Sequence, residues 1–96
     1  MTRFALIELN SGFVWWVGDA DGAIQACQRS DDDTGNTNRA GEFQPISRGE
    51  ISSTAGGYAV HLAPAGFDVQ DGQDPDAITL TDALPLAGYY RRAAEG

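Results

Sequence analysis

The sequence contains no lysine, one cysteine (Cys27) and one histidine (His61), and these shortages exclude several kinds of site. A single cysteine cannot form an internal disulfide, and one cysteine with one histidine cannot supply the ligands of a structural zinc site. The chain has six arginines and 14 carboxylates, which gives a formal net charge of −8. This charge disfavours direct binding to nucleic acid and to anionic membranes, because both attract cationic proteins.

Long hydrophobic runs are also missing from the sequence. No segment approaches the roughly 18 consecutive apolar residues that a membrane-spanning helix needs. Glu8 and Asn10 interrupt the apolar segment near the N-terminus, so we expect no signal peptide and a cytoplasmic location. Hydrophobic residues make up 42% and charged residues 21% of the chain, which is typical of a globular protein. We therefore expect residues 1–96 to form a single α+β domain.

The first two apolar segments predict a β-hairpin. Residues 3–9 and 13–17 are rich in strand-forming side chains, and the connection between them ends in Gly12, which readily adopts the positive φ of a hairpin turn. Because successive side chains of a strand point to opposite faces, we expect Trp15 and Trp16 to lie on opposite sides of the sheet.

A first helix is predicted after the hairpin. Either Asp19 or Asp21 could cap its N-terminus, and their carboxylates would suit the positive end of the helix dipole. Apolar residues then recur with helical spacing from Ala20 to Cys27, and we expect the helix to end near Asp31.

The segment that follows, at about residues 30–57, is long, polar and poor in apolar anchors, and we expect a loop there. A short strand could form within this segment, around residues 43–47 or 50–53. Residues 57–63 alternate clearly between two faces and predict a strand, and residues 67–69 could pair back against it as another short strand.

The C-terminal part carries a second helix signal. Asp74 followed by Pro75 is a typical helix start, although residues 76–84 fit either a helix or a strand, and the start signal favours a helix. Residues 89–92 are expected to close the fold as an edge strand. The predicted fold class is thus α+β, a small single-layer antiparallel sheet of three to five strands with an N-terminal hairpin, packed by two helices.

Cys27 and His61 are the residues on which an enzyme would most readily depend. A catalytic cysteine needs a lowered pKa and a nearby base. Cys27, however, completes the apolar face of the first helix, which is typical of a buried core residue. His61 lies on the small-residue face of its strand, and no sequence pattern brings it to Cys27. We therefore expect no catalytic residue, and a small enzyme that uses Cys27 or His61 remains an alternative.

A calcium site is the other chemistry that the sequence raises. Asp31, Asp33 and Glu42 fall at positions 1, 3 and 12 of a calcium-binding loop, but Asn36 stands where such a loop requires glycine. A solvated acidic segment explains these residues better. No glycine-rich phosphate-binding pattern is present either, so we expect neither a metal nor a cofactor.

The paired tryptophans indicate a function in binding. If one indole packs under a helix, the other belongs to a second apolar sheet face, which is either covered, buried in a homodimer, or exposed to a partner. We expect a non-catalytic protein-interaction module with an acidic rim, to which a basic partner would be complementary. An alternative is an acidic inhibitor that imitates nucleic acid in a basic protein groove, as small accessory proteins of mobile elements do. The residues expected at the interaction surface are Phe4, Leu6, Trp16, Asp31, Asp32 and Asp33.

Overall fold

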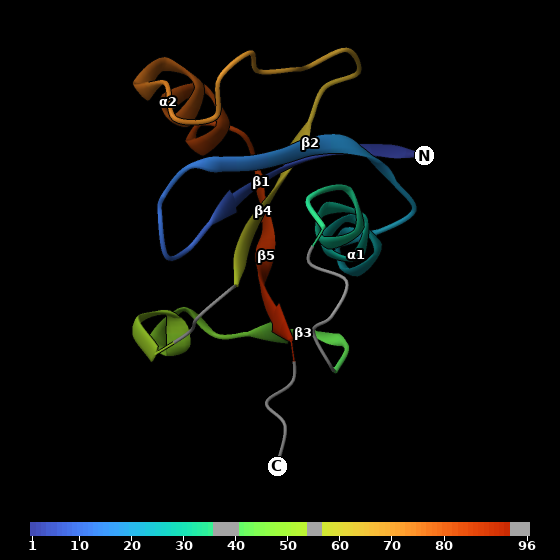
Figure 1. The fold of residues 1–96 in the computed structure, drawn as a ribbon, viewed down its shortest axis with the longest axis vertical. Helices are drawn as coiled ribbons and strands as arrows, with labels where there is room; N and C mark the ends of the chain where they lie inside the picture. Colours follow the sequence, from blue (N-terminus) through green and yellow to red (C-terminus); the bar gives the residue numbers. More distant parts are fainter. Residues whose placement is uncertain (36–40, 54–56, 93–96) are drawn as a thin grey trace.

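The computed structural model describes residues 1–35, 41–53 and 57–92 of the chain. Its elements in chain order, shown in Figure 1, are β1 (Thr2–Glu8), β2 (Val14–Ala20), α1 (Ala23–Asp33), β3 (Phe43–Ile46), the 3-10 helix η1 (Arg48–Ser53), β4 (Tyr58–Ala63), α2 (Pro75–Asp82) and β5 (Leu86–Arg92). Neither α1 nor α2, nor any other described helix, has the length and apolar character needed to cross a membrane.

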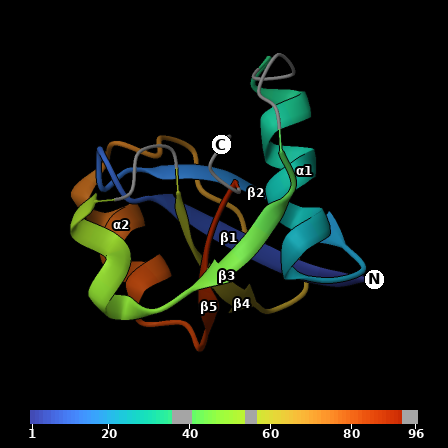
Figure 2. The same ribbon diagram turned by 90° about the horizontal axis from the view of Figure 1, so that it is seen from below.

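The strands form one antiparallel sheet in the order β2-β1-β4-β5-β3. The predicted α+β class is confirmed, with five strands, an N-terminal hairpin and the helices α1 and α2. Helix α1 covers one face of the sheet, whereas α2 and η1 flank the other face (Figure 2). Strand β5 lies between β4 and β3, so the prediction that residues 89–92 form an edge strand is wrong. The short β3 strand occupies that edge instead.

The hairpin contains an irregularity that decides where the two tryptophans go. Leu6 lies opposite Trp16, but a β-bulge between Leu6 and Ile7 then brings Ile7 opposite Val14. Trp15 is therefore the extra residue of the bulge, and strict alternation is lost there. Both indoles pack against the same core cluster. The prediction that Trp15 and Trp16 lie on opposite sides of the sheet is wrong for this reason.

Helix α1 begins later and ends later than expected. Its N-cap is Gly22, without a side-chain cap, because Asp19 belongs to β2, where its carboxylate lies 3.4 Å from the Arg3 guanidinium. The Asp21 amide donates to the Gln25 side chain. The predicted capping by Asp19 or Asp21 is therefore wrong. The face that α1 buries is also shifted from the predicted stripe, and it consists of Ala26, Cys27, Ser30 and Asp31.

The core lies between α1 and the sheet. The buried side chains of this cluster come from α1 and from four of the strands, so the helix and the sheet are held together by one apolar layer. Its members are Phe4, Leu6, Ala20, Ala26, Cys27, Phe43, Tyr58 and Val60.

The second helix forms as its start signal predicts. The Asp74 carboxylate accepts a 2.9 Å hydrogen bond from the Asp76 amide, and Pro75 is the first residue of α2. The predicted strand at residues 67–69 is wrong, because this stretch belongs to the loop before α2. In that loop the Phe67 amide closes a turn onto the Pro64 carbonyl.

The long polar segment is partly ordered into β3 and η1. Strand β3 matches the first of the two short strands considered there, whereas η1 occupies the position of the second. Residues 36–40 and 54–56 of the predicted loop lie outside the described residues.

Candidate functional site

Two of the residues expected at an interaction surface lie in the core. Phe4 is 4% and Leu6 is 0% exposed, because β1 is an inner strand and α1 covers the face on which both side chains lie. The expectation that this face of the sheet is exposed at Phe4 and Leu6 is therefore corrected. Neither side chain can reach a partner on the surface of the folded chain.

Trp16 is half-buried and fixed from two sides. Its indole lies so close over Gly18 that a Cβ atom at Gly18 would stand 2.4 Å from the ring. Its Nε1 donates a 2.7 Å hydrogen bond to the Asp33 carboxylate at the end of α1. The indole thus closes one side of the core, and Asp33 holds it there.

Asp31 is not part of an acidic rim. It is 2% exposed, and its two carboxylate oxygens serve different partners. Oδ1 accepts a 2.9 Å hydrogen bond from the Tyr58 hydroxyl, and Oδ2 accepts from Arg92 Nε at 2.9 Å and Nη2 at 2.8 Å. The correction follows from the shifted face of α1, which turns Asp31 inward and leaves Asp32 and Asp33 exposed.

Cys27 and His61 do not meet. Cys27 lies on the α1 side of the sheet, where burial, and then the negative charge of Asp31, raise the pKa of its thiol. His61 lines a pocket on the opposite side. The sheet separates the two side chains, so they form no nucleophile–base pair. Among the described residues, no group of three or more His, Cys, Asp or Glu side chains could hold a metal ion.

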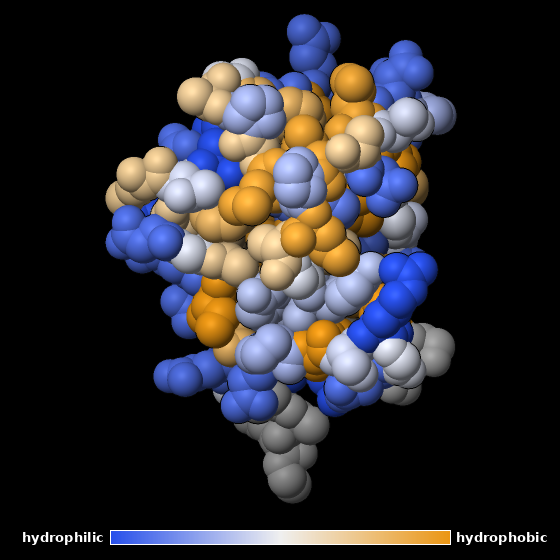
Figure 3. Space-filling view, turned by 180° about the vertical axis from the view of Figure 1, so that it is seen from behind, coloured by the Kyte–Doolittle hydropathy of each residue, from blue (hydrophilic) through white to orange (hydrophobic). Residues whose placement is uncertain are grey.

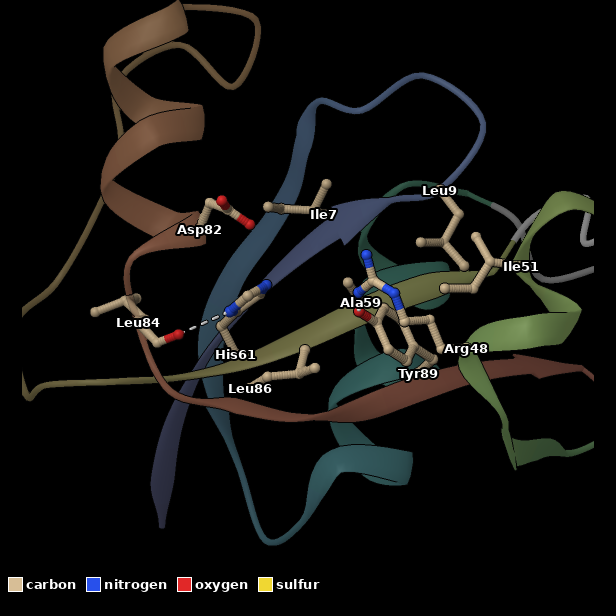
Figure 4. Close-up of a pocket in the computed structure, with 10 residues that line it drawn as sticks. All are labelled: Ile7, Leu9, Arg48, Ile51, Ala59, His61, Asp82, Leu84, Leu86 and Tyr89. Carbon is tan, nitrogen blue, oxygen red and sulfur yellow. Dashed lines mark hydrogen bonds between the residues drawn. The ribbon is translucent and has the colours of Figure 1, made fainter.

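A pocket lies on the sheet face opposite α1, with α2 at one end and η1 at the other (Figure 4). Its volume is about 680 Å³, within the range of about 300–1,000 Å³ that is usual for ligand sites. Aliphatic side chains dominate its lining, and Leu86 is still 47% exposed. The aliphatic lining residues are Ile7, Leu9, Ile51, Ala59, Leu84 and Leu86.

His61 is a buried polar group within this apolar lining, at 4% exposure. Its Nδ1 lies 3.1 Å from the Leu84 carbonyl oxygen. Because a carbonyl only accepts hydrogen bonds, Nδ1 must carry the proton and donate. The other ring nitrogen, Nε2, is directed away from Leu84 (Figure 4). In the neutral form of the ring, this nitrogen can accept a hydrogen bond from a ligand group in the pocket.

The two ends of the pocket carry opposite charges. Arg48, at the start of η1, donates a 2.7 Å hydrogen bond from Nη1 to the Tyr89 hydroxyl on β5. Asp82, at the end of α2, stands at the other end beyond His61 (Figure 4). None of the described lining residues is serine, threonine, cysteine or lysine. The arrangement is suited to binding and orienting an elongated, mostly apolar group.

Sequence reasoning singled out only His61 among the residues of this pocket. One available signal was the alternation in β4, which places Ala59, His61 and Ala63 on one face. Small side chains at the centre of a sheet leave space above them unless a helix fills it. Arg48 and Leu86 had no comparable signal, because their positions at the pocket depend on how η1 and β5 are placed.

Apolar side chains are unevenly distributed over the face of the molecule that Figure 3 shows. Seen from behind, apolar side chains gather over the upper half, whereas polar and charged side chains predominate below and around the margin (Figure 3).

Comparison with known proteins identifies no family for this chain. No family model matches it, and neither the curated proteins nor the solved structures gave a match.

Proposed function

We propose that this protein is a non-catalytic protein-interaction module whose pocket on the α2 side of the sheet receives an apolar segment of a partner protein. The observation that carries the proposal is the pocket itself, a hollow of about 680 Å³ lined by aliphatic side chains of the sheet, η1 and the segment after α2. This relocates the expected interaction surface from the α1 side of the sheet to the opposite face.

Apolar contact supplies the driving force in this proposal. Covering aliphatic surface is worth roughly 25 cal/mol for each Å² removed from water. The pocket lining offers such surface at Leu86, Leu9 and Ile51, none of which is fully buried. When its ring is neutral, His61 also presents Nε2 as an acceptor to a partner segment that places a hydrogen-bond donor over β4.

Selection from a displayed library of random 12-residue peptides tests this function, since it assumes nothing about the partner's sequence. We expect the peptides selected on the wild-type protein to bind Leu86→Glu at least about tenfold more weakly, because a carboxylate replaces apolar contact surface. Ile24→Glu is the matched control, since Ile24 is similarly exposed at 41% but lies on α1. Failure to select any peptide, or equal binding to both variants, would contradict the proposal.

A second candidate is competition with nucleic acid for a basic protein surface, and the distribution of charge favours it. Residues 49–90 contain six carboxylates and no arginine or lysine. Three of these carboxylates, from Asp68, Asp71 and Asp74, line a hollow of about 220 Å³ beside Leu80 of α2. Each uses one oxygen to accept from a nearby backbone amide, which leaves a second oxygen for a cation.

Binding of a nona-arginine peptide tests this second candidate. Replacing Asp68, Asp71 and Asp74 together by Asn should weaken binding several-fold more than the matched changes Asp21→Asn, Asp32→Asn and Glu42→Gln, which remove equal charge elsewhere. The affinity of the wild-type protein should fall steeply between 50 and 300 mM NaCl, at roughly the salt range where exposed charges become screened. Equal losses in the two triple variants would show that only total charge matters.

A further inference from the structure

Arg48 differs from the arginines of the sheet in its partner. Arg3, Arg91 and Arg92 each form an ion pair with a carboxylate, at 3.4, 3.4 and 2.8 Å. Within the described part of the chain, Arg48 forms no such pair, and its side chain donates instead to the neutral hydroxyl of Tyr89. In a protein with 14 carboxylates, a cation that borders the pocket is thus left without an acidic partner there.

The geometry at Arg48 suits an incoming anion. A guanidinium carries five N–H donors in a planar fork, and the Tyr89 hydroxyl occupies Nη1. The remaining donors match the two oxygens of a carboxylate. Leu9 and Ile51 stand beside Arg48 in the lining, so a ligand that covers them would exclude water from the charged contact and strengthen it (Figure 4).

We propose that the partner segment is a peptide in which aliphatic residues adjoin a carboxylate, and that this carboxylate binds Arg48 while the aliphatic side chains cover Leu86 and Ala59. This inference rests on the proposed interaction function. Asp82 at the opposite end of the pocket repels the same carboxylate, so the acidic end of the segment lies toward η1. The net charge of −8 does not prevent this contact, because charges beyond about 8 Å are largely screened at physiological salt.

The selected peptides test the inference by their composition and by their response to Arg48. We expect enrichment of Asp or Glu next to Leu, Ile or Val, and an affinity loss of about five- to tenfold on Arg48→Gln. Arg29→Gln, which removes an exposed arginine of α1, should leave the affinity unchanged within about twofold. Peptides with Glu replaced by Gln should bind wild type more weakly and lose little further affinity on Arg48→Gln, because the pairing is already gone.

The possible failures separate the two proposals. Peptides that need Leu86 but carry no acidic residue, or that lose as much affinity on Arg29→Gln as on Arg48→Gln, would overturn the carboxylate inference and leave the interaction function standing. Octanoate that binds the pocket more tightly than every selected peptide would assign the site to a small apolar carboxylate and overturn a peptide occupant. If no peptide is selected at all, both proposals fall.

Discussion

At the scale of single residues, the most informative position is Asp31. It carries a negative charge into the core, where the Tyr58 hydroxyl and the Arg92 guanidinium satisfy both of its oxygens. The same guanidinium stacks 4.7 Å from the centre of the Phe43 ring. One carboxylate on α1 is therefore bonded to β4 and β5 and, through Arg92, linked to β3. The sequence predicts that Asp31 belongs to a solvated run of three aspartates. In the structure its carboxylate instead holds α1 to the sheet.

This role predicts a large difference between neighbouring aspartates. Asp31→Ala should lower the free energy of unfolding by about 3 kcal/mol, because it leaves the half-buried Arg92 charge without its partner. Asp32→Ala, at an exposed position on the same helix, should change it by less than about 0.5 kcal/mol. Urea denaturation of both variants measures the difference. Equal stabilities would show that the Asp31 contacts do not hold α1 to the sheet.

At the scale of elements, the bulge in β2 explains the main difference between sequence and structure. The hairpin, the strand β4 and the start of α2 follow from turn residues, alternation and capping, which are local signals. A bulge is one inserted residue, and nothing in Trp15-Trp16 marks it. Its consequence is large, because it turns both indoles toward α1 and removes the surface that the alternation predicted.

The edge strand β2 also contacts the loop before α2, and no local sequence pattern predicts this contact. The Val14 amide donates a 2.9 Å hydrogen bond to the Gly72 carbonyl in the loop before α2. A Cβ atom at Gly72 would stand 2.0 Å from the Val14 carbonyl oxygen. Only glycine permits the loop to lie this close to the strand.

Substitution at this glycine tests the placement of the loop. Gly72→Ala should lower the free energy of unfolding by about 2 kcal/mol, because backbone rather than a movable side chain must shift. Gly49→Ala in η1 is the control, since the nearest atom to its added Cβ is 4.0 Å away, and its stability should stay close to wild type. Thermal unfolding followed by circular dichroism distinguishes the two. A wild-type melting temperature for Gly72→Ala would contradict the contact.

At the scale of the whole molecule, the candidate site arises from the arrangement of the layers. Helix α1 spans one face of the sheet, whereas α2 and η1 stand at the two ends of the other face and leave its centre open. The sequence predicts the helices and the strands but not this arrangement, because which face a helix covers depends on crossings between distant segments. The pocket residues Ile7, Arg48, His61 and Leu86 come from four different elements and meet only in the folded chain.

The central claim is that partners bind the α2 side of the sheet. The most direct test is to follow the backbone amide resonances of the wild-type protein while a selected peptide is added to saturation. Binding on the α2 side should give the largest shifts at Ala59, His61, Leu86 and Tyr89, with small shifts along α1. Shifts concentrated at Trp16, Asp32 and Asp33 would contradict it and return the interaction surface to the α1 side of the sheet.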